Sequence, residues 1–261
     1  MTRVLSGAAL IAFGIVVVWF ASNPILEAVA VATLFAAVEE LLALFKASGI
    51  RVPHWPSVLA AIATLMAFSD FIAARQISLE HILMAELIAM ALVALAGWRG
   101  GPDALTSISA SLFPSLYLAI PLGSMIAIRE RGGPAVLSLL MLTVIVSDTA
   151  QYYTGRLLAP AISPKKTVEG AIGGLVFGTA LFAVAGAWWL PIVPAIARVG
   201  MGMGIVAVGI AGDLFESMLK RSANVKDSSA VIPGHGGILD RLDALFFAAP
   251  FFYVVGRFIS L

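Results

Sequence analysis

The chain has 261 residues, of which 61% are hydrophobic and 12% charged, and its formal net charge is +1. About 25% of the residues of an average soluble domain are charged, so most of this surface must meet something other than water. We therefore exclude a soluble domain and expect an integral membrane protein. The chain has no cysteine, which also excludes disulfides, thiolate metal sites and cysteine nucleophiles.

Apolar runs recur along the whole chain. A helix needs about 20 apolar residues to cross a hydrocarbon core about 30 Å thick, and nine runs of roughly this length are present. They cover residues 4–21, 25–46, 56–74, 82–98, 108–128, 134–154, 168–190, 196–219 and 243–260. We predict an all-α, polytopic integral membrane protein with about nine transmembrane helices. The first run could instead be a cleaved signal peptide, but no small-x-small site follows it, so we expect it to be retained.

Turn-forming residues separate several of these runs, as at Gly100-Gly101-Pro102 and Gly132-Gly133-Pro134. With nine spans, eleven lysines and arginines fall in loops on the side of the amino terminus and five on the other side. The positive-inside rule then places the amino terminus in the cytoplasm. No repeat or linker divides the chain, so we expect amino-terminal transmembrane helices over 1–130 and a catalytic transmembrane region with cytoplasmic loops over 131–261.

Acidic residues interrupt the apolar runs, where each costs about 2.5–3.5 kcal/mol on insertion scales. In the eighth run Asp213, Glu216, Ser217 and Lys220 share one helical face. They could form an internal salt bridge or part of a site. Glu39 and Glu40 diverge by about 100° on a helix, so they cannot both serve one compact site. We interpret them as snorkelling or packing residues.

The segment Ser163–Gly170, SPKKTVEG, combines two lysines with a predicted helix start at Thr167. Free backbone N–H groups at such a start suit phosphate. The alternative is a helix cap with two lysines that only set the topology.

The stretch 217–243 gathers acidic, basic and glycine residues between two apolar runs. Two phosphate compounds repel each other, so a site that joins them needs cations and a metal. Candidate Mg²⁺ ligands are Asp213, Asp227, Asp240 and Asp243, and candidate phosphate clamps are Lys220, Arg221, Lys226 and Arg241. Gly234, Gly236 and Gly237 would let backbone N–H groups approach an anion. A zinc hydrolase fits poorly, because only one histidine is nearby.

This stretch resembles the signature of the phosphatidate cytidylyltransferase (CDP-diacylglycerol synthase) family. The matching residues are Ser217, Lys220, Arg221, Lys226, Asp227, Pro233, Gly234, His235, Gly236, Gly237, Asp240, Arg241 and Asp243. The upstream segments GDLFES, SPKKTVEG and SDTAQYYTGR also resemble family elements, so the likeness covers residues 147–243.

The resemblance implies that CTP and phosphatidate react to give CDP-diacylglycerol and pyrophosphate in phospholipid biosynthesis. It also implies Mg²⁺, with K⁺ as a companion cation, a homodimer and no nucleic-acid partner. We expect a multi-pass protein of the cytoplasmic (inner) membrane whose active site faces the cytoplasm.

By the same resemblance Asp213 and Asp240 hold the metal and act in catalysis with Lys226 and Arg241. The expected substrate-binding residues are Asp148, Ser163, Lys165, Lys166, Thr167, Glu169, Glu216, Ser217, Lys220, Arg221, Asp227, His235, Gly236, Gly237 and Asp243. Two rivals stay open. A CTP-dependent lipid kinase would release CDP, and a transporter of anionic lipids or metabolites would need no CTP.

Overall fold

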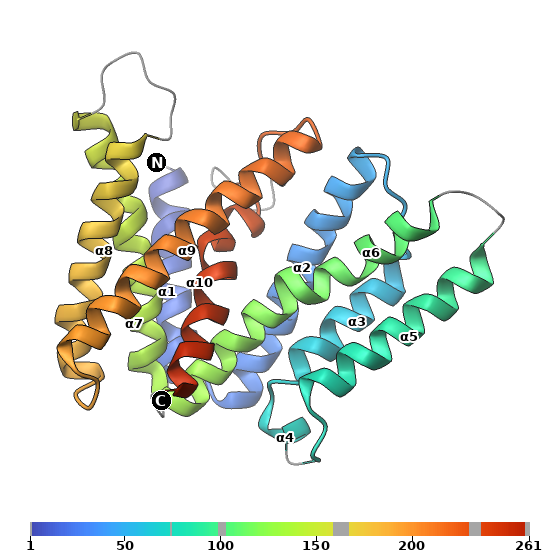
Figure 1. Ribbon diagram of the computed structural model, residues 1–261, viewed down its shortest axis with the longest axis horizontal. Helices are drawn as coiled ribbons and strands as arrows, with labels where there is room; N and C mark the ends of the chain where they lie inside the picture. The colour runs from blue at the N-terminus through green and yellow to red at the C-terminus, as the bar shows by residue number, and fades with distance from the viewer. Residues whose placement is uncertain (1, 74, 99–102, 159–166, 230–235, 259–261) are drawn as a thin grey trace. The chain divides into compact units, whose positions relative to one another are not determined.

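The structure is a computed structural model that describes residues 2–73, 75–98, 103–158, 167–229 and 236–258. Every regular element within these ranges is a helix (Figure 1). The elements are α1 (Thr2–Phe20), α2 (Asn23–Ala47), α3 (His54–Met66), α4 (Asp70–Ala73), α5 (Leu79–Gly97), α6 (Ala104–Pro114), η1 (Ser115–Ala119), α7 (Ile120–Leu158), α8 (Val168–Trp189), α9 (Ala195–Ser222) and α10 (Leu239–Phe258). The all-α part of the prediction is confirmed.

Five helical stretches in the described ranges are long and apolar enough to cross a membrane. They are Asn23–Ala47, Leu79–Gly97, Ala104–Leu157, Val168–Trp189 and Ala195–Ser222. Nine separate membrane helices are not confirmed. One reason is that the third expected span, 56–74, is broken where α3 ends at Met66. The expected spans 108–128 and 134–154 fall within the stretch Ala104–Leu157, which the non-helical Gly133 divides between them.

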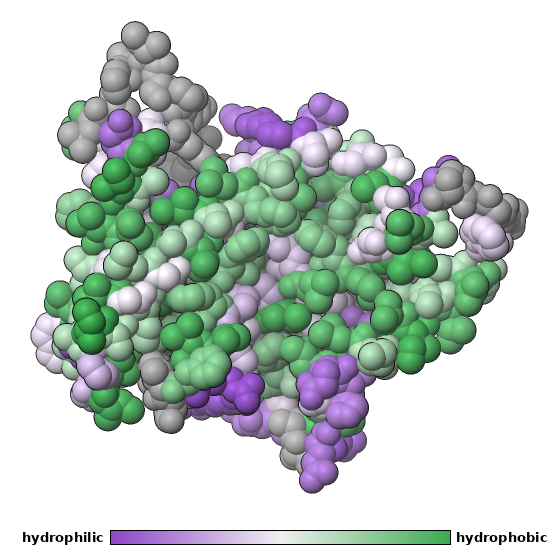
Figure 2. Space-filling view, in the orientation of Figure 1, coloured by the Kyte–Doolittle hydropathy of each residue, from purple (hydrophilic) through white to green (hydrophobic). Residues whose placement is uncertain are grey.

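Hydrophobic side chains cover most of the face that Figure 2 shows. On α5, for example, Leu87, Ile88 and Leu92 are 46%, 54% and 60% exposed. Such extensive apolar surface is unfavourable in water and is expected of helices that face lipid.

The chain forms two compact units, and the division is not sequential. One unit comprises Met1–Ala127 with Phe215–Leu242, and the other comprises Ile128–Leu214 with Asp243–Leu261. The end of α9, the loop after it and the first turn of α10 therefore belong to the same unit as the amino-terminal helices. Most residues of the predicted signature lie in this segment.

The core of the first unit forms around α3, which contacts α2, α5, α6 and η1. Leu34 and Leu41 of α2, Leu65 of α3 and Leu118 of η1 are fully buried. Pro114 ends α6 and lacks the N–H of a regular helical hydrogen bond, and the next turn is the π-helical η1.

An aromatic cluster ties the end of α9 into this unit. Phe215 of α9 lies 5.4 Å from Tyr117 of η1 and 6.2 Å from Phe113 of α6, measured between ring centroids. Phe113 also meets Phe45 of α2 at 5.9 Å. These rings fix the turn of α9 that carries Glu216 and Lys220.

In the second unit, Phe182 of α8 meets Phe252 of α10 edge to face, with 5.7 Å between the centroids. The α7 segment bends at Gly133, whose φ of 81° and ψ of 173° are not helical. A positive φ is readily adopted only by glycine, and Pro134 begins the next helical turn. The predicted break at Gly132-Gly133-Pro134 is confirmed.

Candidate active site

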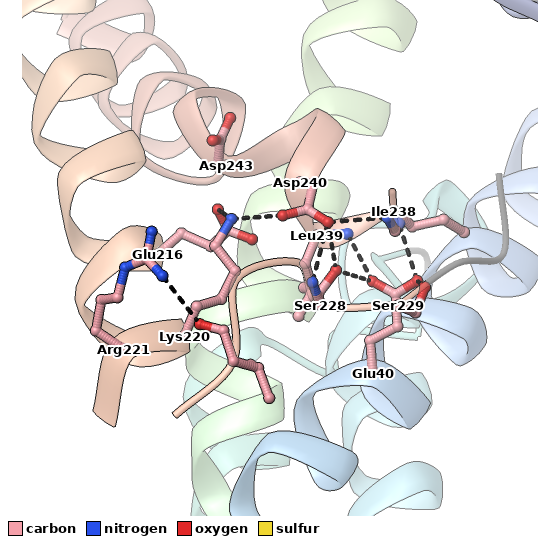
Figure 3. Close-up of polar contacts among 12 residues, drawn as sticks. Glu40, Glu216, Lys220, Arg221, Ser228, Ser229, Ile238, Leu239, Asp240 and Asp243 are labelled. Carbon is pink, nitrogen blue, oxygen red and sulfur yellow. Dashed lines mark hydrogen bonds and ion pairs between the residues drawn. The ribbon is translucent and has the colours of Figure 1, made fainter. Parts of the chain in front are cut away.

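Lys220 lies between two carboxylates (Figure 3). Its Nζ is 2.8 Å from Oε2 of Glu216, one turn earlier on α9, and it also donates to Oδ1 of Asp240 in the first turn of α10. The side chains of Lys220, Glu216 and Asp240 are only 12%, 1% and 8% exposed. The internal salt bridge left open from sequence is therefore present, and it extends to a third residue from another helix.

The other oxygen of Asp240 organises the loop between α9 and α10. Oδ2 accepts hydrogen bonds from the backbone N–H of Ser228 at 3.1 Å and from the N–H of Gly237 at 2.9 Å, and it lies 2.9 Å from the Ser228 hydroxyl oxygen. Burial raises the pKa of the Asp240 carboxyl, but the hydrogen bonds from Lys220, Gly237 and Ser228 lower this pKa by more than burial raises it. The pKa thus lies below its usual value, and Asp240 is ionised at neutral pH.

Glu40 of α2 reaches the same loop, although it is 188 residues before Ser228 in the chain. Its carboxylate accepts from the hydroxyls of Ser228 and Ser229 and from the backbone N–H groups of Ile238 and Leu239. The side chain is buried, at 4% exposure. The interpretation of Glu40 as a snorkelling residue is wrong.

Glu39 shows why the sequence was misleading at this position. It points elsewhere and pairs with His54 at 2.7 Å, with about two fifths of each side chain exposed. The 100° argument correctly excluded a shared role for the two neighbours. It could not identify the one that faces the site, because the hydrogen-bonding partners of Glu40 lie in a distant part of the chain.

Gly236 and Gly237 have structural reasons to be glycine. Gly236 has a φ of 82°, which favours glycine. A Cβ on Gly237 would lie 2.1 Å from the Ser228 hydroxyl and 2.3 Å from Oε2 of Glu40. The loop can close on these side chains only if position 237 has none, whether or not the two glycines also approach an anion.

Four more residues of the signature lie at exposed positions around this network: Arg221, Lys226, Asp227 and Arg241. Arg221 donates to the backbone carbonyl of Val225 at 3.5 Å. Ser217 is half-buried on α9. Arg221, Lys226 and Arg241 are thus exposed, and their role as phosphate clamps stays a prediction.

Asp213 and Asp243 belong to the second unit. Here α9 and α10 pass close together, because a Cβ on Gly212 would lie 2.6 Å from the carbonyl oxygen of Asp243. Asp213 follows Gly212 directly on α9. The carboxylate of Asp243 accepts from the N–H of Ala244 at 2.7 Å.

The predicted upstream residues that the structure describes, Asp148, Thr167 and Glu169, also lie in the second unit. Thr167 caps α8 by accepting from the N–H of Gly170 at 3.1 Å, which confirms the cap, and Glu169 lies in the first turn. Asp148 is exposed on α7 and accepts from Gln151 at 3.1 Å. Ser163, Lys165, Lys166 and His235 lie outside the described residues.

The fit of a metal can be tested on Asp240. The described residues contain no group of three or more acidic or histidine side chains that could hold an ion. Mg²⁺ often uses only one or two carboxylates and takes its other ligands from phosphates and water. Both oxygens of Asp240 already accept hydrogen bonds, Oδ2 from the N–H groups of Ser228 and Gly237 and Oδ1 from Lys220, so Asp240 would hold Mg²⁺ only as one ligand among phosphate and water oxygens.

Comparison with known proteins shows which family has this sequence. The sequence profile of the Cytidylyltransferase family matches residues 1–259. The chain belongs to this family. It is 38% identical over 156 residues to the phosphatidate cytidylyltransferase of Aquifex aeolicus, a match that covers 58% of each chain.

Two other relatives of the same name show the same pattern. The Synechocystis protein is 50% identical over 106 residues, which are 39% of this chain and 34% of the relative. The Bacillus subtilis protein is 41% identical over 112 residues, which are 41% and 42% of the two chains. In all three cases the match spans less than two thirds of the relative's own length.

Proposed function

We propose that this protein is a phosphatidate cytidylyltransferase, which converts CTP and phosphatidate to CDP-diacylglycerol and pyrophosphate. Membership of the Cytidylyltransferase family and the names of the relatives support this activity. The observation that carries the proposal is that α9, the loop after it and α10 bring Lys220, Ser228 and Asp240 of the signature region into one buried network.

The reaction needs charge neutralisation more than a strong base. A phosphate oxygen of phosphatidate attacks the α-phosphorus of CTP and forms a new P–O bond. The bond between the α-phosphorus and the bridging oxygen breaks, and pyrophosphate leaves with the electron pair. Since the attacking group is already an anion, the protein contributes by holding two anions in line and offsetting their repulsion.

The exposed cations near the network can supply this neutralisation. Arg221, Lys226 and Arg241 are the described candidates for contacts with the phosphates of CTP and phosphatidate, and Lys165 and Lys166 remain candidates by sequence. Lys220 is already paired with Glu216 and Asp240. Its role is to hold the site's geometry as well as to face a substrate.

We propose Mg²⁺ as the cofactor, with Asp213 and Asp240 as its protein ligands and K⁺ as a companion cation. Two carboxylates suit an ion that completes its coordination with CTP phosphates and water. When bound, such an ion neutralises charge on the triphosphate. Asp240 is ready for this role because its hydrogen bonds keep it ionised.

We further propose nine membrane helices in a bacterial inner membrane, with the amino terminus and the α9–α10 loop on its cytoplasmic side. The excess of lysine and arginine on one side supports this orientation. A cytoplasmic loop would give the signature residues access to CTP. A homodimer is proposed from the family resemblance alone.

One assay separates the proposed activity from its rivals. Purified protein in detergent is incubated with phosphatidate, Mg²⁺ and CTP labelled in the cytidine, and the lipid and aqueous products are separated. Labelled CDP-diacylglycerol with an equal yield of pyrophosphate is expected. Labelled CDP without a labelled lipid would identify a kinase, and unchanged CTP would count against either reaction.

A further inference from the structure

The carboxylate of Glu40 joins Ser228 and Ser229, within the loop between α9 and α10, to the start of α10 (Figure 3). Oε1 accepts from the hydroxyl of Ser229 at 2.6 Å and from the N–H of Ile238 at 2.9 Å. Oε2 accepts from the hydroxyl of Ser228 and from the N–H of Leu239, both at 2.9 Å. One side chain from α2 thus links the middle of the loop to the start of α10.

Glu40 also completes the start of α10. The first N–H groups of a helix have no partner within the helix. Leu239 is the first residue of α10 and Ile238 precedes it, and both donate to Glu40. The N–H groups of Ile238 and Leu239 can only donate, one to each oxygen of Glu40, so the side chain must accept at both oxygens. A glutamine would place its NH₂ group against one of these N–H donors.

Ser228 relays this anchor to Asp240. Its hydroxyl oxygen lies 2.9 Å from Oε2 of Glu40 and 2.9 Å from Oδ2 of Asp240, and its N–H also donates to Oδ2. A side chain at position 237 would collide with Ser228 and Glu40 and shift the loop, so the close approach requires Gly237. The position of Asp240, and through it that of Lys220, therefore depends on a residue from a helix outside the signature.

We propose that Glu40 is a positioning residue for the transfer reaction, which holds Asp240 in place through Ser228. The inference rests on the proposed cytidylyltransferase activity. A shift of about 1 Å in a group that orients the reactants can lower a rate about 100-fold. A positioning role predicts that kcat falls while the KM values for both substrates change little.

The test compares Glu40→Gln with Glu39→Gln. The two variants make the same chemical change at neighbouring positions, but Glu39 lies outside the network and only pairs with the half-exposed His54. Glu40→Gln should lower kcat about 10- to 100-fold, with KM values within about threefold of the wild type. Glu39→Gln should keep wild-type kinetics. Glu40→Asp keeps the charge but withdraws the oxygens by one methylene, so it should be impaired as well.

Two further measurements separate positioning from general stability. Hydrogen exchange should speed up in peptides that contain the Ile238 and Leu239 amides in Glu40→Gln, but not in peptides from the interior of α10. Ser228→Ala leaves the direct bonds from Glu40 to α10 intact and cuts the relay, so kcat should fall in this variant too. The double variant Glu40→Gln/Ser228→Ala should lose little more than the worse single variant.

The outcomes are distinct. If folded Glu40→Gln matches Glu39→Gln in kcat, the positioning role is overturned. If Glu40→Gln does not fold, Ser228→Ala decides the matter, and an unchanged kcat in that variant overturns the relay. A wild-type protein that makes no CDP-diacylglycerol would instead overturn the proposed function, whereas an active wild type with an active Glu40→Gln overturns only this inference.

Discussion

Replacing Lys220 by methionine should destabilise the protein as well as slow it. Methionine has a similar length, but it leaves Glu216 and Asp240 without their shared cation. Removing one partner of a buried ion pair costs about 3–5 kcal/mol. We expect about 3 kcal/mol, the lower end, because Asp240 keeps its hydrogen bonds from Ser228 and Gly237.

Thermal unfolding in detergent measures this cost. At about 2–4 °C per kcal/mol for a chain of this size, Tm should fall by about 6–12 °C. Adding Glu216→Gln to Lys220→Met removes the buried negative charge that Lys220 neutralises in the wild type. The double variant should therefore recover part of the lost Tm. Lys226→Met is the control, because Lys226 is exposed. It should lower kcat/KM and leave Tm nearly unchanged.

The reasoning would be refuted if Lys220→Met unfolded at the wild-type temperature, or if Lys226→Met destabilised the protein equally. The first result would mean that the ion pairs with Glu216 and Asp240 contribute nothing net to stability. The second would mean that the loss reflects the removal of any positive charge from this loop.

Other expected outcomes concern the metal, the loop and the topology. Asp213→Asn and Asp240→Asn should each abolish pyrophosphate release in protein that still folds, and added Mg²⁺ should rescue little. Wild-type rates in both would remove the metal assignment. Gly237→Ala should lower both Tm and kcat because its Cβ would meet Ser228 and Glu40, whereas Gly200→Ala should be tolerated, since nothing lies within 4 Å of a Cβ there. In this chain without cysteines, single cysteines at the amino terminus and at position 226 should label from the same side of the membrane, and labelling from opposite sides would refute the topology.

Local features of the protein could be predicted from sequence because their causes lie within a few residues. The break at Gly133 follows from a glycine followed by a proline, and the start of α8 follows from the capping side chain of Thr167. The helical class follows from the apolar runs, and the signature chemistry follows from the spacing within 217–243. The number of spans does not follow in the same way, because hydropathy does not show where an apolar run stops being helical, as it does after Met66 within 56–74.

The partners of the charged side chains were decided only by the tertiary structure. Helical spacing predicts that Glu216 and Lys220 can meet, but not that Asp240 completes the ion pair from another helix. Glu40 is the clearest case, because its four donors lie 188 to 199 residues away in the chain. A buried carboxylate is stabilised by the donors that the fold brings to it, and sequence spacing has no bearing on which donors arrive. The residue that anchors the loop therefore became visible only when the fold brought the N–H groups of Ile238 and Leu239 to Glu40.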